Sequence, residues 1–440
     1  MSLLVSFDGF VPQLRAFITR SQEQPVPEAE LDAEFNRLAA ALFALQRDAV
    51  PIYGEFCAKR KVSAVADWRE IPALPAAAFK EFEVTSLPPA QRTHVFHSSG
   101  TTQHRPSRHF HNAQSLALYE ESLRPWFRRH FLPEQAAIGG GADRSDRTDQ
   151  AICNPQSAIR NPQSAIRNPQ SAKPVVNERI SESASGNSEL TGSLTPASLT
   201  APASPQSAIR NPQLIILTPS PAQAPHSSLA YMFDTVRADF GAAIFSGRVN
   251  GDGAWALDLE QTMAALREAQ SAGQPVALLG TASSFVLLLD HCRAGRTAFR
   301  LAPGSRALET GGYKGRGRAA PKWELRQMMT RWLGMPESRI LAEYGMSELS
   351  SQAYDRVIPE AGGGFRFPPW ARARIISPET GREAAEGETG LVQVVDLANV
   401  RSALAVQTED LAVRCGAGFE LTGRAAGTAA RGCSLMLAEL

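Results

Sequence analysis

The chain has 440 residues, 43% hydrophobic and 20% charged, so we expect most of it to fold, as one large α/β domain or as two domains. A formal net charge of +1 argues against the broad basic surface of a nucleic-acid-binding protein. No segment reaches the ~20 continuous apolar residues of a membrane span. The first residues, MSLLVSFDGFVPQLRAF, lack the basic start and the cleavage site expected of a signal peptide, and the five cysteines show no CxxC spacing. These features favour a cytoplasmic protein without a disulfide framework or zinc site.

The first 70 residues predict helices. Apolar side chains recur at three- and four-residue spacing and would form a stripe along one helix face. The stripe consists of Leu31, Phe35, Leu38, Leu42 and Leu45. Pro51 interrupts the pattern, and a second apolar stretch follows at 52–57. Two prolines make 71–84 an extended connector with a short helical turn, and 113–131 predicts another helix.

Residues 142–213 differ from the rest in composition. NPQSAIR occurs at 154–160 and 161–167, NPQSAKP follows, and PQSAIRNPQ returns at 205–213. A proline in each seven-residue repeat excludes a coiled coil. Because large apolar side chains are few, we expect a disordered insert in a surface loop with no role in the chemistry. Binding of a partner protein is the alternative.

After the insert, apolar strands alternate with helices. Strands are predicted at 214–218, 241–247, 275–285, from 339, at 372–376 and at 391–396, with helices at 262–273 and 322–334. Gly334 and Pro336 would end the second helix. This alternation is typical of a parallel or mixed sheet covered by helices, and therefore of the α/β class. The predicted divisions are 1–141, the insert 142–213, 214–422 and a tail at 423–440.

Five polar segments follow predicted strands in this order: SSGTT, ETGGYKGRGR, EYGMSE, TEDLA and TGR. If the strands are parallel, these segments would converge at the carboxyl edge of the sheet, where open α/β sheets bind ligands. The run HSSGTT at 97–102 supplies hydroxyls, backbone N–H groups and a glycine, which suit the wrapping of a polyphosphate. Taken alone, it would equally fit an ordinary Ser/Thr-rich turn.

The order and spacing of these segments resemble the adenylate-forming superfamily of acyl- and aryl-CoA synthetases, luciferases and peptide-synthetase adenylation domains. Within it, IPALPAAAFKEF, LETGGYKGRGR, EYGMSELSSQ and the terminal RGCSL resemble the LuxE-type acyl-protein synthetases, the fatty-acid ligases of bacterial bioluminescence. The resemblance runs from about Ile71 to the C-terminus, apart from the insert. It implies an adenylation domain of mixed and parallel sheets covered by helices, with a truncated C-terminal lid.

By this resemblance, the phosphate loop would hold the β- and γ-phosphates of ATP. It consists of Ser98, Ser99, Gly100, Thr101 and Thr102. The lysine that usually follows such a loop is missing, and Gln103, His104 and Arg105 stand in its place. Arg105 or Arg108 would then supply the positive charge.

The resemblance also implies the nucleotide contacts. Gly311 and Gly312 would lie against the adenine, and Tyr344, followed by Gly345, would stack on it. Asp410 of TEDLA would accept hydrogen bonds from the ribose hydroxyls.

Three further residues would serve the reaction. Glu348 would bind the Mg²⁺ that bridges the ATP phosphates, and Ser347 would place its hydroxyl near the substrate carboxylate. Arg424 matches the hinge arginine of the superfamily. The implied cofactors are ATP and Mg²⁺, and the implied substrate is a fatty acid, expected to be long-chain.

Sixteen residues follow Arg424, none of them lysine, so the usual lid with its catalytic lysine is not expected. In the LuxE-type family a cysteine near the C-terminus receives the acyl group and passes it to a partner reductase. Cys433 in RGCSL matches that cysteine, and Arg431 would lower its pKa. Cys57 and Cys292 are expected to be buried thiols and Cys415 a strand residue.

Several alternatives stay open at this point. In one alternative, the chain is a ligase that passes the acyl group to CoA, a carrier protein or another small acceptor. In another, it is a non-catalytic homologue that only binds a nucleotide or a partner. The histidines around the loop would hold a metal, contact phosphate or face solvent, although their spacing fits no common metal site. They are His94, His97, His104, His109 and His111. The apolar run 285–289 would line an acyl channel or form a core helix.

Overall fold

The computed structural model describes residues 6–23, 26–98, 105–136, 211–251, 253–311, 320–360 and 363–425. The chain divides into two units, Met1–Cys153 together with Asn211–Leu440, and Asn154–Arg210. All described residues belong to the first unit. The predicted repeat insert therefore lies outside the described residues except for its last three positions, 211–213.

Three helices begin the chain, as predicted: α1 (Phe7–Glu23), α2 (Glu28–Ala49) and α3 (Pro51–Lys59). The predicted stripe of α2 is buried at Phe35, Leu38 and Leu42, each with an exposed fraction of 0%. Pro51 occupies the first turn of α3, where the N–H that proline lacks would have no helical partner.

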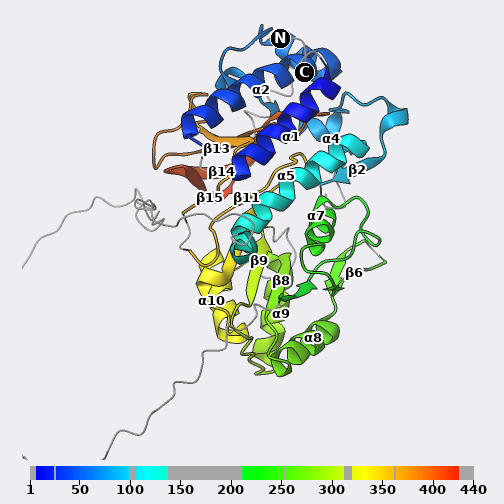
Figure 1. The fold of residues 1–440 in the computed structure, drawn as a ribbon, viewed down its shortest axis with the longest axis vertical. Helices are drawn as coiled ribbons and strands as arrows, with labels where there is room; N and C mark the ends of the chain where they lie inside the picture. The colour runs from blue at the N-terminus through cyan, green and yellow to red at the C-terminus, as the bar shows by residue number, and fades with distance from the viewer. Residues whose placement is uncertain are drawn as a thin grey trace, which may run out of the picture. The chain divides into compact units, whose positions relative to one another are not determined.

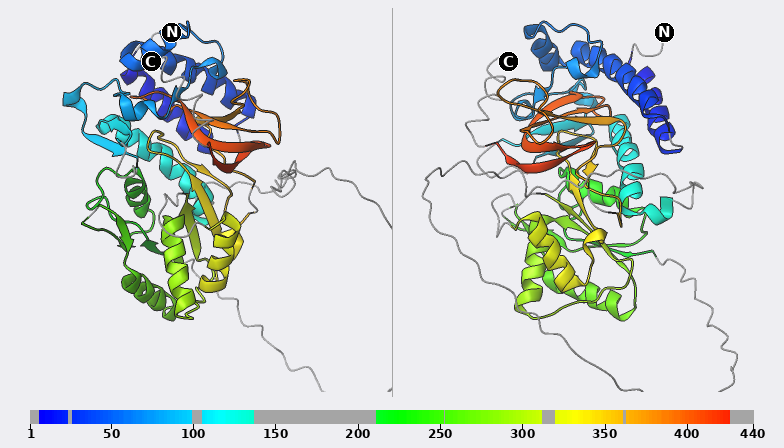
Figure 2. Two further views of the ribbon diagram at one scale, coloured as in Figure 1. Left: turned by 180° about the vertical axis from the view of Figure 1, so that it is seen from behind. Right: turned by 90° about the vertical axis from the view of Figure 1, so that its left-hand side faces the viewer.

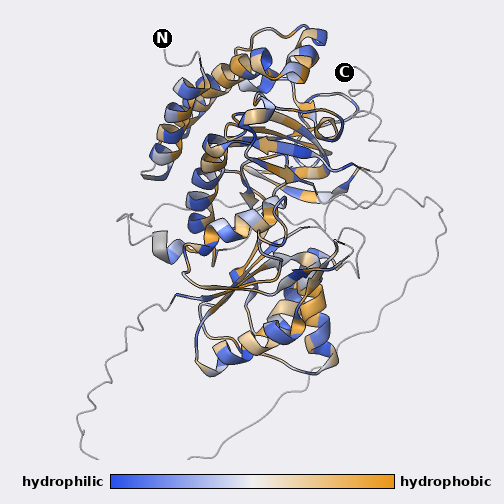
Figure 3. Cartoon of the chain, turned by 90° about the vertical axis from the view of Figure 1, so that its right-hand side faces the viewer, coloured by the Kyte–Doolittle hydropathy of each residue, from blue (hydrophilic) through white to orange (hydrophobic). Residues whose placement is uncertain are grey.

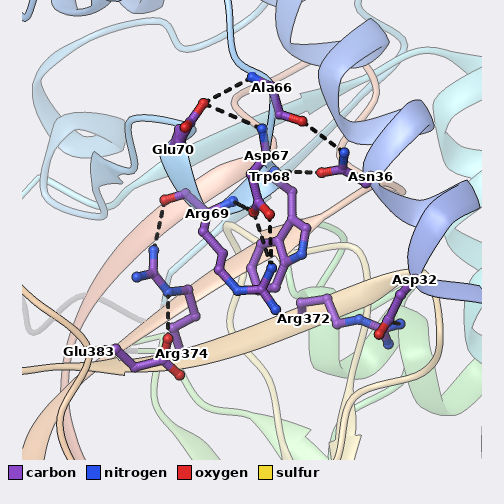
Figure 4. Close-up of polar contacts among 10 residues, drawn as sticks. All are labelled: Asp32, Asn36, Ala66, Asp67, Trp68, Arg69, Glu70, Arg372, Arg374 and Glu383. Atoms are coloured by element: carbon purple, nitrogen blue, oxygen red, sulfur yellow. Dashed lines mark hydrogen bonds and ion pairs between the residues drawn. The ribbon is translucent and has the colours of Figure 1, made fainter. Parts of the chain in front are cut away.

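A polar network fixes these helices to the neighbouring sheet (Figure 4). The short helix η1 (Trp68–Glu70) begins with a capping box formed by Asp67 and Glu70. Trp68 meets the ring of Phe35 edge-on at 5.5 Å. From the sheet, Arg372 donates to Asp32 at 2.7 Å, and Arg374 donates to the carbonyl oxygen of Arg69 at 2.8 Å. The helical layer is thereby attached to strand β12.

That sheet has five strands, in the order β1–β14–β13–β12, with β15 also paired to β14. Their bounds are β1 (Leu74–Pro75), β12 (Ala371–Ile376), β13 (Thr389–Asp396), β14 (Ala405–Cys415) and β15 (Gly418–Arg424). The predicted connector at 71–84 contributes β1, parallel to β14, and the single turn α4 (Ala78–Glu81). The predicted strands at 372–376 and 391–396 are confirmed as β12 and β13.

The second sheet has six strands, in the order β11–β10–β9–β8–β4–β5. They are β4 (Gln213–Ile216), β5 (Ala243–Phe245), β8 (Val276–Thr281), β9 (Arg306–Thr310), β10 (Ile340–Tyr344) and β11 (Ala353–Tyr354). All neighbours are parallel except β11, which runs antiparallel to β10. The predicted mixed α/β class is confirmed (Figure 1).

Helices cover both faces of this sheet (Figure 2). On one side, α5 (Ala113–Phe131) and α7 (Ser228–Arg237) share a core with Leu308 and Leu341. On the other, α8 (Leu259–Ser271), α9 (Ala282–Ala294) and α10 (Lys322–Leu333) share a core with Ala307 and Ile340. Alternate residues of each strand therefore face opposite layers. The predicted helices at 113–131, 262–273 and 322–334 are confirmed.

One predicted strand was too long. The apolar run at 275–285 is strand β8 only to Thr281, whose hydroxyl caps helix α9 by accepting from the Ser284 N–H at 3.1 Å. Phe285, Leu288 and Leu289 are 0% exposed within α9, so the run at 285–289 is helical and packs in the core except at Leu287, which is 50% exposed. The hydropathy colouring shows apolar residues on these helices (Figure 3).

The remaining elements are short. Two hairpins are formed by β2 (His94–His97) with β3 (Arg108–His111) and by β6 (Gly247–Val249) with β7 (Trp255–Leu257). Single turns are α6 (Pro133–Ala136), η2 (Pro89–Gln91) and η4 (Glu337–Arg339). The predicted strand at 241–247 is thus divided between β5 and the start of β6.

Two sequence-wide expectations can be compared with the described residues. Cys57 and Cys292 are buried free thiols, as predicted. Cys415 lies at the end of β14, as predicted, but it is disulfide-bonded, which departs from the expected absence of disulfides. Among the helices that the structure describes, none is long and apolar enough to cross a bilayer.

Candidate active site

The hairpin of β2 and β3 holds the two ends of the predicted phosphate loop together. The backbone N–H of Ser98 donates to the carbonyl oxygen of Ser107 at 3.2 Å, and the N–H of Ser107 donates to the Ser98 hydroxyl at 3.0 Å. The predicted loop residues Ser99, Gly100, Thr101 and Thr102 lie outside the described residues. The structure therefore fixes where the loop leaves and re-enters the hairpin.

The end of this hairpin contacts the predicted EYGMSE segment. The hydroxyl oxygens of Ser107 and Ser347 are 3.3 Å apart, and the Ser347 hydroxyl donates to Glu348 Oε2 at 3.0 Å. The Nδ1 atom of His109 lies 2.9 Å from the carbonyl oxygen of Ser347. Ser107, just before β3, and His109, within β3, thus join the hairpin to the predicted EYGMSE segment, about 240 residues away in the sequence.

Burial and hydrogen bonding set the charge of this group. Burial raises the pKa of Glu348, while the hydroxyls of Ser107 and Ser347 and the charge of Lys80 oppose that increase. Burial lowers the pKa of His109 to about 4, so its imidazole is neutral at pH 7. Because Nδ1 must carry the proton that it donates to a carbonyl, Nε2 is left as an acceptor.

Two of these residues, Ser107 and Lys80, had not been predicted to act here. Lys80 is half-buried on α4, within AFKEF, a segment that carried the family resemblance. Arg108, one suggested source of positive charge, instead forms an ion pair with Glu83 at 3.5 Å, and Arg105 is exposed. Among the described lysines and arginines, Lys80 is the cation whose charge acts on Glu348.

A second group joins the predicted nucleotide residues. The Tyr344 hydroxyl donates to Asp410 Oδ2 at 3.0 Å, and Arg424 Nε lies 3.6 Å from Asp410 Oδ1. Burial raises the pKa of Asp410, and Arg424 and the Tyr344 hydroxyl oppose the increase. The ring of Tyr344 meets Phe419 edge-on at 5.5 Å. Three predicted residues from separate segments therefore lie together.

The glycines of the site lie at strand ends. Gly311 follows β9 and is exposed, with open space where a Cβ would project, whereas Gly312 lies outside the described residues. Gly345 follows β10, and a Cβ there would stand 2.3 Å from Oε1 of Glu343. A side chain at position 345 would therefore displace the Glu343 carboxyl group.

The predicted placement at strand ends is only partly correct. Gly311 and Gly345 do follow parallel strands. Asp410, however, lies in the middle of β14, and Arg424 ends the antiparallel strand β15, where the two residues are register partners. The phosphate loop starts from a separate hairpin. TEDLA does not end a strand because the apolar pattern continues beyond it through Val413 to Cys415.

Comparison with known proteins places this geometry in context. The chain is 23% identical over 193 residues, 42% of its length, to the long-chain-fatty-acid–luciferin-component ligase of Vibrio harveyi, and it spans about half (50%) of that relative. No family model matches the chain. A solved structure of 2-hydroxyisobutyryl-CoA ligase, in an open conformation with 2-HIB-AMP and CoA, aligns over 92% of this chain and 77% of that chain, with a TM-score of 0.53 and 12% identity.

The same ligase in its postadenylation state with 2-HIB-AMP aligns over 92% of this chain and 70% of that chain, with a TM-score of 0.54 and 11% identity. The chain has the fold of the adenylate-forming ligases. The Vibrio match confirms the predicted similarity to the LuxE-type ligases, which the sequence motifs had indicated.

The adenylate-forming fold raises the question of where Mg²⁺ would bind. Glu348 supplies a buried carboxylate, and Ser107 and Ser347 add hydroxyl oxygens beside it. Oxygen ligands suit this hard cation, which usually takes one or two carboxylates and completes its shell with phosphates and water. Within the described ranges, no three His, Cys, Asp or Glu side chains gather as a metal site. Glu348 therefore fits a shared protein–phosphate site.

Two of the histidines around the predicted loop are buried rather than solvated. His109 and His111 are 2% and 1% exposed, and their rings lie 4.3 Å apart. Burial lowers the pKa of both. Solvation is therefore wrong for these two residues, and His104 lies outside the described residues, as does Cys433.

Proposed function

We propose that this chain activates a carboxylic acid with ATP, forming an acyl-AMP and pyrophosphate. The contact of Ser107 with Ser347 and Glu348 is the observation that supports it most strongly. This contact brings the base of the predicted phosphate loop to the buried carboxyl group of Glu348 and to the hydroxyl of Ser347. The Tyr344–Asp410–Arg424 group, joined through the carboxyl group of Asp410, would hold the adenosine.

In the proposed first step, a carboxylate oxygen of the acid attacks the α-phosphorus of ATP and pyrophosphate leaves. Both reactants are anions, so their repulsion must be offset. Ser347 would orient the carboxylate, Lys80 would add positive charge, and His109 would hold the Ser347 backbone in place. Glu348 would hold Mg²⁺, which offsets phosphate charge when bound. Asp410 would accept hydrogen bonds from the ribose hydroxyls.

In the proposed second step, the thiolate of Cys433 attacks the carbonyl carbon of the acyl-AMP, and AMP leaves. The mixed anhydride is reactive enough for this transfer without a further activating group. The acyl thioester would then pass to a partner protein, such as a reductase. Similarity to the Vibrio long-chain-fatty-acid–luciferin-component ligase supports a long-chain fatty acid as substrate. The protein acceptor is proposed from the RGCSL motif around Cys433.

Transfer to a separate thiol is the second candidate. The aligned 2-hydroxyisobutyryl-CoA ligase structure contains CoA beside the acyl-AMP, so the shared fold accommodates such an acceptor in that enzyme. In this case the acyl-AMP would form as above, and Cys433 would have no covalent role.

The test is the intact mass of the full chain after incubation with ATP, Mg²⁺ and a mixture of fatty acids. We expect a hydroxylamine-labile increase equal to one acyl chain, which Cys433→Ser abolishes. Cys292→Ser is the matched control, because Cys292 is a buried free thiol elsewhere in the fold. An adduct that survives in Cys433→Ser would refute transfer to this residue. Pyrophosphate release without any adduct would favour a separate acceptor.

A further inference from the structure

Two buried polar side chains beside the proposed site are not used by the proposed mechanism. Glu343 of β10 and Tyr354 of β11 are register partners, so they project from the same face of the sheet. Their exposed fractions are 7% and 1%. Glu343 is two residues beyond Leu341, which packs in the core shared with α5, so this pair faces α5.

Both groups lack hydrogen-bond partners among the residues that the structure describes. The hydroxyl of Tyr354 is buried without a hydrogen-bond partner. For the carboxyl group of Glu343, burial and the charge of Glu309 set the pKa, and no hydrogen bond from a described residue contributes. The hydroxyl of Tyr119 on α5 accepts from Gln352 Nε2 at 3.4 Å. Because an unpaired buried polar group costs free energy, native proteins usually satisfy such groups or keep them for a ligand.

The local charge makes this pair neutral rather than ionic. Burial, together with the charge of Glu309 on the adjacent strand, raises the pKa of Glu343 to about 8. On the opposite face of the sheet, the charges of Lys322 and Arg326 lower the pKa of Glu309, which burial raises. Glu343 is therefore mostly protonated at pH 7. A carboxylic acid and a phenol together offer hydrogen-bond donors and acceptors, but no net charge.

The position of Glu343 connects the pair to the proposed reaction. Its Oε1 atom lies against the open side of Gly345, 2.3 Å from where a Cβ would stand. Ser347, which would orient the substrate carboxylate, is two residues further along the same loop. An acyl chain that reaches Ser347 from the α5 side would pass beside Glu343 and Tyr354.

We propose that Glu343 and Tyr354 recognise a hydroxyl group on the acyl chain, so that the preferred substrate is a hydroxylated carboxylic acid. A hydroxyl both donates and accepts one hydrogen bond, and it matches a neutral pair better than an ammonium or a carboxylate would. A plain alkyl chain would leave both protein groups without hydrogen-bond partners. A site of this kind therefore binds the hydroxylated acid more tightly than the acid that lacks the hydroxyl. This inference rests on the proposed function for its location beside the acyl site.

The test measures direct binding by calorimetry, without ATP, of a fatty acid and of its hydroxylated isomers of equal chain length. We expect at least one isomer to bind about tenfold more tightly than the plain acid. Tyr354→Phe and Glu343→Leu should each bring the two affinities together. Tyr53→Phe, which removes another buried phenol hydroxyl far from the site, should leave the ratio unchanged. Tyr354→Phe removes only an unpaired hydroxyl, so we expect it to fold.

Equal binding of all acids, or a preference that persists in Tyr354→Phe, would overturn the proposal. Pyrophosphate release measured with the same acids separates the two claims. Release with no preference for hydroxylated acids would refute this inference and leave the proposed function standing. Selective binding without release would refute the proposed activation and support recognition of the hydroxyl.

Discussion

The two faces of strands β9 and β10 treat buried carboxyl groups in different ways. On the α10 side, Asp355 lies 3.0 Å from Lys322, pairs with Arg326 and accepts from the Ala342 N–H at 2.8 Å. On the α5 side, burial and the charge of Glu309 act on the carboxyl group of Glu343, and no described cation or hydrogen-bond donor offsets them. The first arrangement holds the fold together, and the second leaves hydrogen-bonding capacity that a ligand would use. Burial alone therefore does not separate structural acids from functional ones.

The largest effect should come from the paired face. Burial acts to raise the pKa of Asp355, but Lys322 and Arg326 hold it lower, at about 2. Asp355→Ala should reduce the free energy of unfolding by about 3–5 kcal/mol, because it leaves buried cations without their partner. Urea unfolding at pH 7 measures this, with Asp48→Ala, an exposed acid, as control.

The contribution of Asp355 also has a defined pH dependence. Because its pKa is depressed in the folded state, its stabilisation is present above the ordinary value of 3.8 and is lost as the pH falls toward 2. A variant with unchanged stability at pH 7 would show that the pairing is not structural.

Glu348 should matter for activity more than for stability. Glu348→Gln should lower acid-dependent pyrophosphate release by roughly 10²- to 10³-fold, because the amide cannot offer the negative charge that binds Mg²⁺. Glu379→Gln, an exposed acid on the same chain, is the control. Release at the wild-type rate in Glu348→Gln would contradict the assigned role.

Glu343→Gln tests the other side of the sheet, where the carboxyl group has no described cation beside it. Because the folded pKa of Glu343 is raised from 4.5 to about 8, the wild-type protein should lose stability as the pH rises through this range. The amide cannot ionise, so the variant should gain roughly 4 kcal/mol relative to the wild type between pH 4.5 and 8, most of the full shift at about 1.4 kcal/mol per unit. Unfolding curves at both pH values measure it, and parallel curves would contradict an unpaired carboxyl group.

The smallest expected effect concerns Lys80. Lys80→Ala should raise the KM for ATP roughly tenfold by removing one positive charge beside the phosphates, and Lys80→Arg should restore most of the loss. Lys59→Ala tests an exposed lysine on α3 and should change nothing. If Arg105→Ala has the larger effect instead, the missing loop cation is Arg105.

Much of this fold follows from local sequence signals. Helix α5 begins and ends at the predicted residues, since Asn112 caps it by accepting from the Ser115 N–H at 2.9 Å. The change from strand to helix at Thr281 was missed because one apolar run continues through both elements. Its cap, Thr281 with Ser284, was the available signal.

Sequence motifs predicted part of the candidate site, and the fold adds residues that the motifs did not assign to it. The motifs predicted Ser347, Glu348 and Asp410 as site residues. They did not predict that Asp410 lies inside a strand. Ser107 lies in no motif, and Lys80 lies in IPALPAAAFKEF, which supported the resemblance but gave Lys80 no role. Only the fold brings the two residues to Glu348. Glu343 and Tyr354 look like ordinary strand residues in the sequence, because cross-strand register cannot be read from either segment alone.

Acid-dependent exchange of labelled pyrophosphate into ATP tests the central claim most directly, because it requires reversible formation of an acyl-AMP and needs no acceptor. We predict exchange with the full-length protein and a suitable acid, retained in Cys433→Ser and lost in Glu348→Gln. Absence of exchange with any acid in the hydroxylated and plain series, or conversion of ATP to ADP and phosphate instead, would contradict adenylation by this chain.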